Sequence, residues 1–121
     1  MSRDYSLYID DIRESCERIM NYVAGLSRED FFGDQKSYDV VVRNLTIIGE
    51  AVKNVPAELR DQFSEVEWTK IARFRDFTVH RYWSLDDTII WDIVQNKVPE
   101  LLANVSPDEG ANTERKPFPD L

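Results

Sequence analysis

The chain has 121 residues, of which 42% are hydrophobic, so it is long enough for one domain with a buried core but not for two. Its apolar runs are far shorter than the ~20 residues that cross a bilayer, its first residues lack the pattern of a signal peptide, and Cys16 is its one cysteine, so we expect a cytoplasmic protein without a membrane segment. A formal net charge of −8 repels phosphate at long range, which excludes non-specific binding of nucleic acid and requires any contact with it to be local.

The first predicted element is a long amphipathic helix over residues 5–23. Apolar side chains recur there at steps of three and four residues, with charged side chains between them, and Gly25 ends the pattern. The stretch that follows, "LSREDFFGDQK", has an N-cap candidate at Ser27 and a helix breaker at Gly33, which predicts one short helix between them. The predicted buried face of the first helix consists of Tyr5, Tyr8, Ile12, Cys16, Ile19, Met20 and Val23.

A second long helix is predicted over residues 37–55, "SYDVVVRNLTIIGEAVKNV". Pro56 fits the first position of a short third helix over residues 56–63, because its missing amide hydrogen is not needed there. The apolar stripe of the second helix consists of Val41, Leu45, Ile48 and Val52.

A fourth helix is predicted from Trp68 into residues 73–83, "RFRDFTVHRYW". The next residues, "SLDD", have Ser84 at an N-cap position and an acidic residue three positions later, a variant of the capping box that predicts the start of a fifth helix. Pro99 supplies no amide hydrogen and should kink or split that helix, which then resumes near Leu101. The predicted buried face of the fifth helix consists of Leu85, Ile89, Ile90, Ile93 and Val94.

No stretch alternates convincingly enough to predict a strand, so the expected fold class is all-α: an up-and-down helical bundle of four principal helices plus short helices. We expect this bundle to occupy residues 1–105. Residues 106–121 are polar, hold three of the five prolines and show no period, which predicts a flexible tail or a docking arm. The chain has no Gly-rich phosphate loop, no Cys/His metal spacing and no Gly-x-Ser-x-Gly elbow, which removes most common enzyme chemistries.

The segment 73–83 is the strongest candidate for a functional site. It contains the chain's one histidine, His80, among three arginines and several aromatic residues. The longer segment 67–83 is net positive, so it can attract phosphate locally although the whole chain is negative. Its charged residues are Lys70, Arg73, Arg75 and Arg81 against Glu67 and Asp76.

The spacing of these residues leaves two arrangements open. On a straight helix Arg75 and His80 point roughly 140° apart, whereas Arg75 and Tyr82 share a face. Asp76 lies one turn before His80. Either the helix breaks near residues 78–80, or two chains bring their segments together and pool the side chains.

The stretch "RDFTVHRY" resembles the Arg-x4-His-x-Tyr motif of HEPN-domain proteins of the HepT type. These are ribonuclease toxins paired with minimal nucleotidyltransferase (MNT) antitoxins. The resemblance extends to "VVRNLTIIGEAVKNVP" and "YWSLDDTIIWDIV", and so to most of residues 4–104. It implies that Arg75 and His80 are the catalytic pair, that Asp76 and Tyr82 support them, and that Tyr82 is the site where the antitoxin attaches AMP. Asn is more common in the family at the position of Asp76.

The chemistry of these residue types agrees with that resemblance. Cleavage of RNA without a metal needs proton transfer to and from oxygen and positive charge beside the phosphate. Imidazole can transfer the proton near neutral pH, and the planar fork of arginine matches phosphate. One histidine cannot be acid and base at once, so two histidines across a homodimer would complete the set. We therefore expect a metal-independent endoribonuclease toxin of a type VII HEPN/MNT toxin-antitoxin system, with no cofactor of its own.

Plainer interpretations stand beside this one. A lone histidine near a helix end is more often a packing or capping residue, and Arg75 could pair with a surface carboxylate. Asn44, Glu50 and Arg81 could line the cleft, although Glu50 could equally belong to a polar stripe with Arg43. The three tryptophans are better explained by packing than by base stacking. At the level of function, the alternatives are a non-catalytic nucleotide- or nucleic-acid-binding HEPN subunit of a nucleotidyltransferase complex and a purely structural helical subunit.

Overall fold

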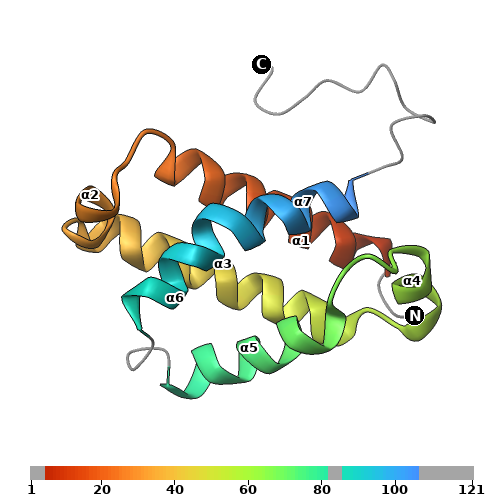
Figure 1. The fold of residues 1–121 in the computed structure, drawn as a ribbon. Helices are drawn as coiled ribbons and strands as arrows, with labels where there is room; N and C mark the ends of the chain where they lie inside the picture. Colours follow the sequence, from red (N-terminus) through yellow and green to blue (C-terminus); the bar gives the residue numbers. More distant parts are fainter. Residues whose placement is uncertain (1–4, 82–85, 107–121) are drawn as a thin grey trace, which may run out of the picture.

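The computed structural model describes residues 5–81 and 86–106, and this part of the chain is helical with no strand. Figure 1 shows the chain passing back and forth along one direction, through α1, α3, α5 and then α6 and α7. Helix α3 lies at the centre, because it packs against both α1 and α5, while α7 covers α1. The all-α fold class and the up-and-down arrangement are therefore as predicted.

Helix α1 spans Ser6–Val23, and the chain turns after it at Gly25, whose φ of 80° favours glycine. The predicted buried face is partly wrong at its first turn, because Tyr5 is 45% exposed and Ile9 takes its place in the core. The short helix α2 spans Arg28–Phe32 and begins with the predicted N-cap, Ser27, which forms a capping box. The end of α1, followed by Gly25, and the start of α2, capped by Ser27, are thus set by local sequence signals.

Cys16 is fully buried on α1. Burial, followed by the negative charge of Glu17, raises the pKa of its thiol to about 12. We therefore expect Cys16 to resist alkylation by iodoacetamide at pH 8 in the native protein and to react fully in guanidinium chloride, because the thiolate is the reactive form. Intact-mass spectrometry over time is the measurement, and rapid labelling of the folded chain would contradict the burial described here.

Helix α3 spans Gln35–Asn54 and begins two residues before the predicted start. Its N-cap is Asp34, whose carboxylate accepts a hydrogen bond from Ser37 Oγ at 2.7 Å and one from the backbone of Lys36 at 3.2 Å. These bonds, the Ser37 bond foremost, lower the pKa of Asp34. The predicted apolar stripe of this helix is confirmed, since Val41, Leu45, Ile48 and Val52 are all buried.

The turn between α3 and α5 is held by side chains. Helix α4 spans Ala57–Gln62. Pro56 is its N-cap, whereas the prediction placed this proline at the first helical position. Arg60 donates to the carbonyl oxygens of Val55 at 3.0 Å and Val52 at 2.9 Å, which satisfies the end of α3. Its guanidinium also lies 5.6 Å from the ring centre of Trp68, the first residue of α5. Arg60 therefore links the end of one long helix to the start of the next.

The C-terminal helical rod has three parts: α6 over Asp87–Asp92, a π-helical turn over Ile93–Lys97 and α7 over Val98–Val105. The predicted split at Pro99 is confirmed, because this proline lies in the first turn of α7. The predicted N-cap is wrong: Asp86, and not Ser84, accepts the bond from the amide of Thr88, at 2.7 Å. Ser84 itself lies outside the described residues.

The predicted buried face of the rod is correct in part. Ile90 and Val94 are buried, but Ile89 is 50% exposed. Leu85 lies outside the described residues. Helix α6 is only six residues long, so one narrow stripe of its surface packs against the core. Ile89 lies next to this stripe and not within it.

Helix α7 ends at Val105, whose carbonyl accepts a hydrogen bond of 2.8 Å from Arg13 of α1. The predicted tail lies outside the described residues from position 107 onward, so the division into a bundle of residues 1–105 and a tail of 106–121 stays a prediction. Among the helices described, none is long and apolar enough to cross a membrane.

Candidate functional site

Helix α5 carries the predicted site residues and runs unbroken over Trp68–Arg81. The suggestion of a break near residues 78–80 is therefore wrong, because backbone hydrogen bonding continues through this stretch. Positions 75 and 80 consequently lie on different faces of one helix, roughly 140° apart. The side chains of His80 and Arg81, and all of Tyr82, lie outside the part of the structure that is described.

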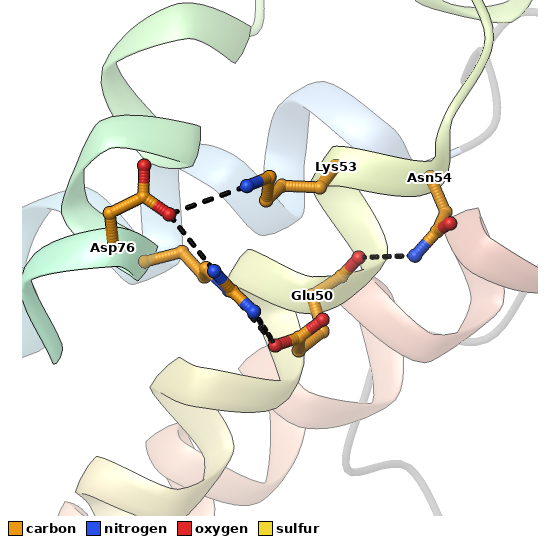
Figure 2. A network of polar contacts seen from close by, with 5 residues as sticks. Glu50, Lys53, Asn54 and Asp76 are labelled. Carbon is orange, nitrogen blue, oxygen red and sulfur yellow. Dashed lines mark hydrogen bonds and ion pairs between the residues drawn. The ribbon is translucent and has the colours of Figure 1, made fainter. Parts of the chain in front are cut away.

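Arg75 is the centre of a polar network between α3 and α5, drawn in Figure 2. Its Nε donates to Oε2 of Glu50 at 2.9 Å, and its Nη2 donates to the same oxygen. Its Nη1 donates to Oδ1 of the neighbouring Asp76 at 2.9 Å. Lys53 forms an ion pair of 3.4 Å with that Asp76 oxygen. The structure therefore brings together three residues predicted for the site, namely Arg75, Asp76 and Glu50.

The network exists because α5 approaches α3 very closely at Gly49. A Cβ atom at position 49 would overlap Cβ and Cγ of Arg75 and lie 3.0 Å from its Cα. Only glycine leaves room for the backbone of α5 here. Arg75 is thereby seated on α3, with its guanidinium beside the next residue, Glu50.

The electrostatics of the network favour its charged forms. The hydrogen bond that Arg75 donates to Glu50, followed by the one that it donates to Asp76, raises the pKa of Arg75. The bond from Arg75, followed by that from Lys53, lowers the pKa of Asp76. Arg75 is only 20% exposed, whereas Glu50 and Asp76 are about half exposed. The side chain of Arg75 is thus less exposed than either of the carboxylates that accept its hydrogen bonds.

The other sequence candidates lie elsewhere. Asn44 is buried, and its Nδ2 donates to the carbonyl of Val40 at 2.8 Å, so it does not join the Arg75 network. Arg43 is exposed. Trp68 is buried and Trp91 packs 5.7 Å from the ring of Phe31, so the packing interpretation of these two tryptophans is confirmed. Trp83 lies outside the described residues.

A cavity of about 240 Å³ opens between α3, α5, the π-helical turn and α7. Its floor is apolar, with Leu45, Ile48, Ile71 and Leu101 among its lining residues. None of the predicted site residues whose side chains the structure describes lines it, so the cavity and the polar network are separate features. No cluster of three or more potential metal ligands occurs in residues 5–81 and 86–106.

Comparison with known proteins agrees with the family resemblance of the motif. The sequence model of the family described as "Ribonuclease HepT-like" matches residues 12–107. The chain belongs to the HepT-like ribonuclease family. Ribonuclease activity is therefore supported at the level of the family. No solved structure matches the chain.

Three relatives illustrate the range of the HepT-like family. A protein of Caldanaerobacter subterraneus subsp. tengcongensis named "Putative RNase" is 43% identical over 78% of this chain and 84% of its own length. A "Probable ribonuclease HepT" of Thermococcus cleftensis is 37% identical over 84% of this chain and 92% of its own length. A longer protein of Methanocaldococcus jannaschii, named "Gamma-glutamylcyclotransferase and putative RNase", is 35% identical, and the match spans 46% of it.

Two residues that form the polar network around Arg75 were missed from the sequence. Gly49 lies in the interior of a helix, where glycine is unfavourable, and that was the available signal of a close approach. Lys53 gave no signal, because its partner Asp76 is 23 positions away in sequence.

Proposed function

We propose that this chain is a metal-independent endoribonuclease toxin of the cytoplasm, with Arg75 and His80 as its catalytic pair. The observation that carries the proposal is the position of Arg75, whose Cβ and Cγ lie against Gly49 and whose guanidinium donates to two carboxylates. A planar cation fixed in this way is suited to hold the phosphate whose charge grows in the transition state of RNA cleavage. His80 would transfer the proton.

The proposed active form is a homodimer. Each chain has one histidine, and the unbroken helix α5 separates positions 75 and 80 around its axis. A second chain would supply a second imidazole, so that one could act as acid and the other as base. Asp76 would support the site from its contact with Arg75.

The purified chain should cleave single-stranded RNA in the presence of EDTA and elute as a dimer in size-exclusion chromatography with light scattering. EDTA removes divalent ions, so cleavage in its presence shows that the reaction does not need them. RNA binding without any cleavage would contradict the ribonuclease and support the non-catalytic binding subunit. Cleavage by a protein that is monomeric at the assay concentration would contradict the dimer.

The proposed partner is a nucleotidyltransferase antitoxin that transfers AMP to Tyr82. An AMP group adds a negative phosphodiester and would repel the RNA backbone from the basic segment around Arg75. Co-expression with such a partner, encoded beside this chain, should raise the intact mass by one or more AMP units. Tyr82→Phe should keep the unmodified mass and remain toxic. A neutralised complex in which Tyr82 is unmodified would show that inhibition occurs by occlusion instead.

A further inference from the structure

Glu50 holds Arg75 along one edge of the guanidinium. A single oxygen, Oε2, accepts from both Nε and Nη2, which are the two nitrogens of that edge. Glu50 belongs to α3 and Arg75 to α5, so this contact crosses the seam between the helices. Because Gly49 already fixes the start of the Arg75 side chain, Glu50 fixes its end. The guanidinium is therefore oriented by Glu50 from α3, in addition to the bond that its Nη1 donates to Asp76 of α5.

Glu50 also changes the charge of the network. Lys53 and Arg75 contribute two positive charges, and Glu50 and Asp76 contribute two negative charges, so the four groups sum to zero. Glu50 is 49% exposed, so an approaching phosphate meets its carboxylate together with the guanidinium. A phosphate would be attracted more weakly to this neutral cluster than to an uncompensated arginine.

We propose that Glu50 is a positioning residue that orients Arg75 for catalysis and offsets its charge, so that it raises the rate of cleavage while weakening the binding of RNA. This inference rests on the proposed function, in which Arg75 contacts the phosphate. It assigns opposite effects to one carboxylate. Loss of a residue that only stabilised the fold would not lower the rate of cleavage and tighten the binding of RNA at the same time.

Glu50→Gln removes the charge and keeps the size of the side chain. We expect kcat to fall by roughly 10-fold, because a less well fixed guanidinium spends less time in the productive geometry. We expect RNA to bind more tightly, and the slope of log K against log salt concentration to steepen by about 0.7, the value for one additional phosphate contact on single-stranded nucleic acid. Binding is measured with a fluorescent single-stranded RNA in the His80→Ala background, so that the RNA is not cut.

Two further variants separate charge from geometry. Glu50→Asp keeps the charge but is one methylene shorter, so the salt slope should return to the wild-type value while kcat stays reduced. Glu58→Gln on α4 makes the same change of charge at an exposed carboxylate away from Arg75, and it should leave kcat and the salt slope unchanged.

The Arg75→Ala background tests whether Glu50 acts through Arg75. There, Glu50→Gln should no longer steepen the salt slope. If Arg75→Ala itself leaves cleavage intact, the proposed function fails. If Arg75→Ala abolishes cleavage but Glu50→Gln behaves like Glu58→Gln, the proposed function stands and this inference is overturned. A slope that steepens equally in both backgrounds would also overturn it, because Glu50 would then act on RNA directly.

Discussion

Arg75→Lys is expected to lower the rate of RNA cleavage by about 100-fold or more, although the positive charge is kept. The guanidinium uses Nε and Nη2 on Glu50 and Nη1 on Asp76, so its plane is fixed from two sides. An ammonium group is a point charge without a plane, and it cannot make these bonds and present a fork to phosphate. Loss of one well-oriented donor to a transition-state oxyanion costs roughly 100- to 1,000-fold in rate. Single-turnover cleavage of RNA at saturating enzyme is the measurement.

The matched control is Arg73→Lys, which makes the same substitution at an exposed position two residues earlier on α5. It should leave the rate nearly unchanged. His80→Ala should remove activity as Arg75→Ala does, since the proposal gives proton transfer to the imidazole. Full activity in His80→Ala would end the assignment of this histidine, and equal losses in the two lysine variants would mean that the effect is not specific to Arg75.

Gly49→Ala should destabilise the protein by about 1–3 kcal/mol, the usual cost of overpacking. Helix propensity alone predicts the opposite, because alanine is favoured over glycine inside a helix by roughly 1 kcal/mol. The clash should prevail because the new Cβ would overlap Cβ and Cγ of Arg75 and meet its Cα at 3.0 Å, and a backbone atom cannot rotate away. Urea denaturation gives the free energy of unfolding, and RNA cleavage should fall as well because α5 moves.

A double variant shows whether the contact with Arg75 is the cause. Arg75→Gly removes Cβ and Cγ and leaves only the 3.0 Å approach to Cα, so adding Gly49→Ala to it should cost clearly less than the single substitution does. If Gly49→Ala lowers the free energy of unfolding equally with and without Arg75→Gly, the steric clash is not with the side chain of Arg75. Increased stability of the single Gly49→Ala variant would contradict the close approach of α3 and α5.

Local signals in the sequence explain which parts of the fold could be predicted. Ser27 and Gly33 set the ends of α2 through their own side chain and backbone, and the apolar stripe of α3 recurs at steps of three and four residues from Val41 to Val52. The start of α6 could not be predicted because the sequence offers both serine and aspartate as N-cap residues two positions apart, and Asp86 is the N-cap in the structure. The exposure of Ile89 could not be predicted, because it depends on which neighbour covers a helix of six residues.

The candidate site shows a similar limit. Arg75 and Asp76 were found from a short motif, and Glu50 was considered only as a cleft or stripe residue. The contact of Arg75 with Glu50 and that of Asp76 with Lys53 depend on the packing of α5 against α3. The partners are 25 and 23 positions apart in the sequence, respectively. No periodicity within one helix reports a distance between two helices. Gly49 was the one local sign of that crossing.

The π-helical turn at Ile93–Lys97 has a consequence for insertions and deletions in the C-terminal rod. In this turn the amide of Val98 bonds to the carbonyl of Ile93, five residues earlier, so the turn holds one residue more than an α-helical turn. This extra residue keeps Ile90, Val94 and Val98 on one buried face at regular steps of four. Deletion of one residue here would restore an ordinary α-helix in which the amide of Val98 bonds four positions back, so α7 would keep the same face toward α1, whereas a one-residue deletion within α6 or α7 would rotate the parts of the rod on either side of it by roughly 100°. The π-helical turn therefore takes up one residue of chain length, and the bundle should tolerate a one-residue deletion at Ile93–Lys97 better than one within α6 or α7.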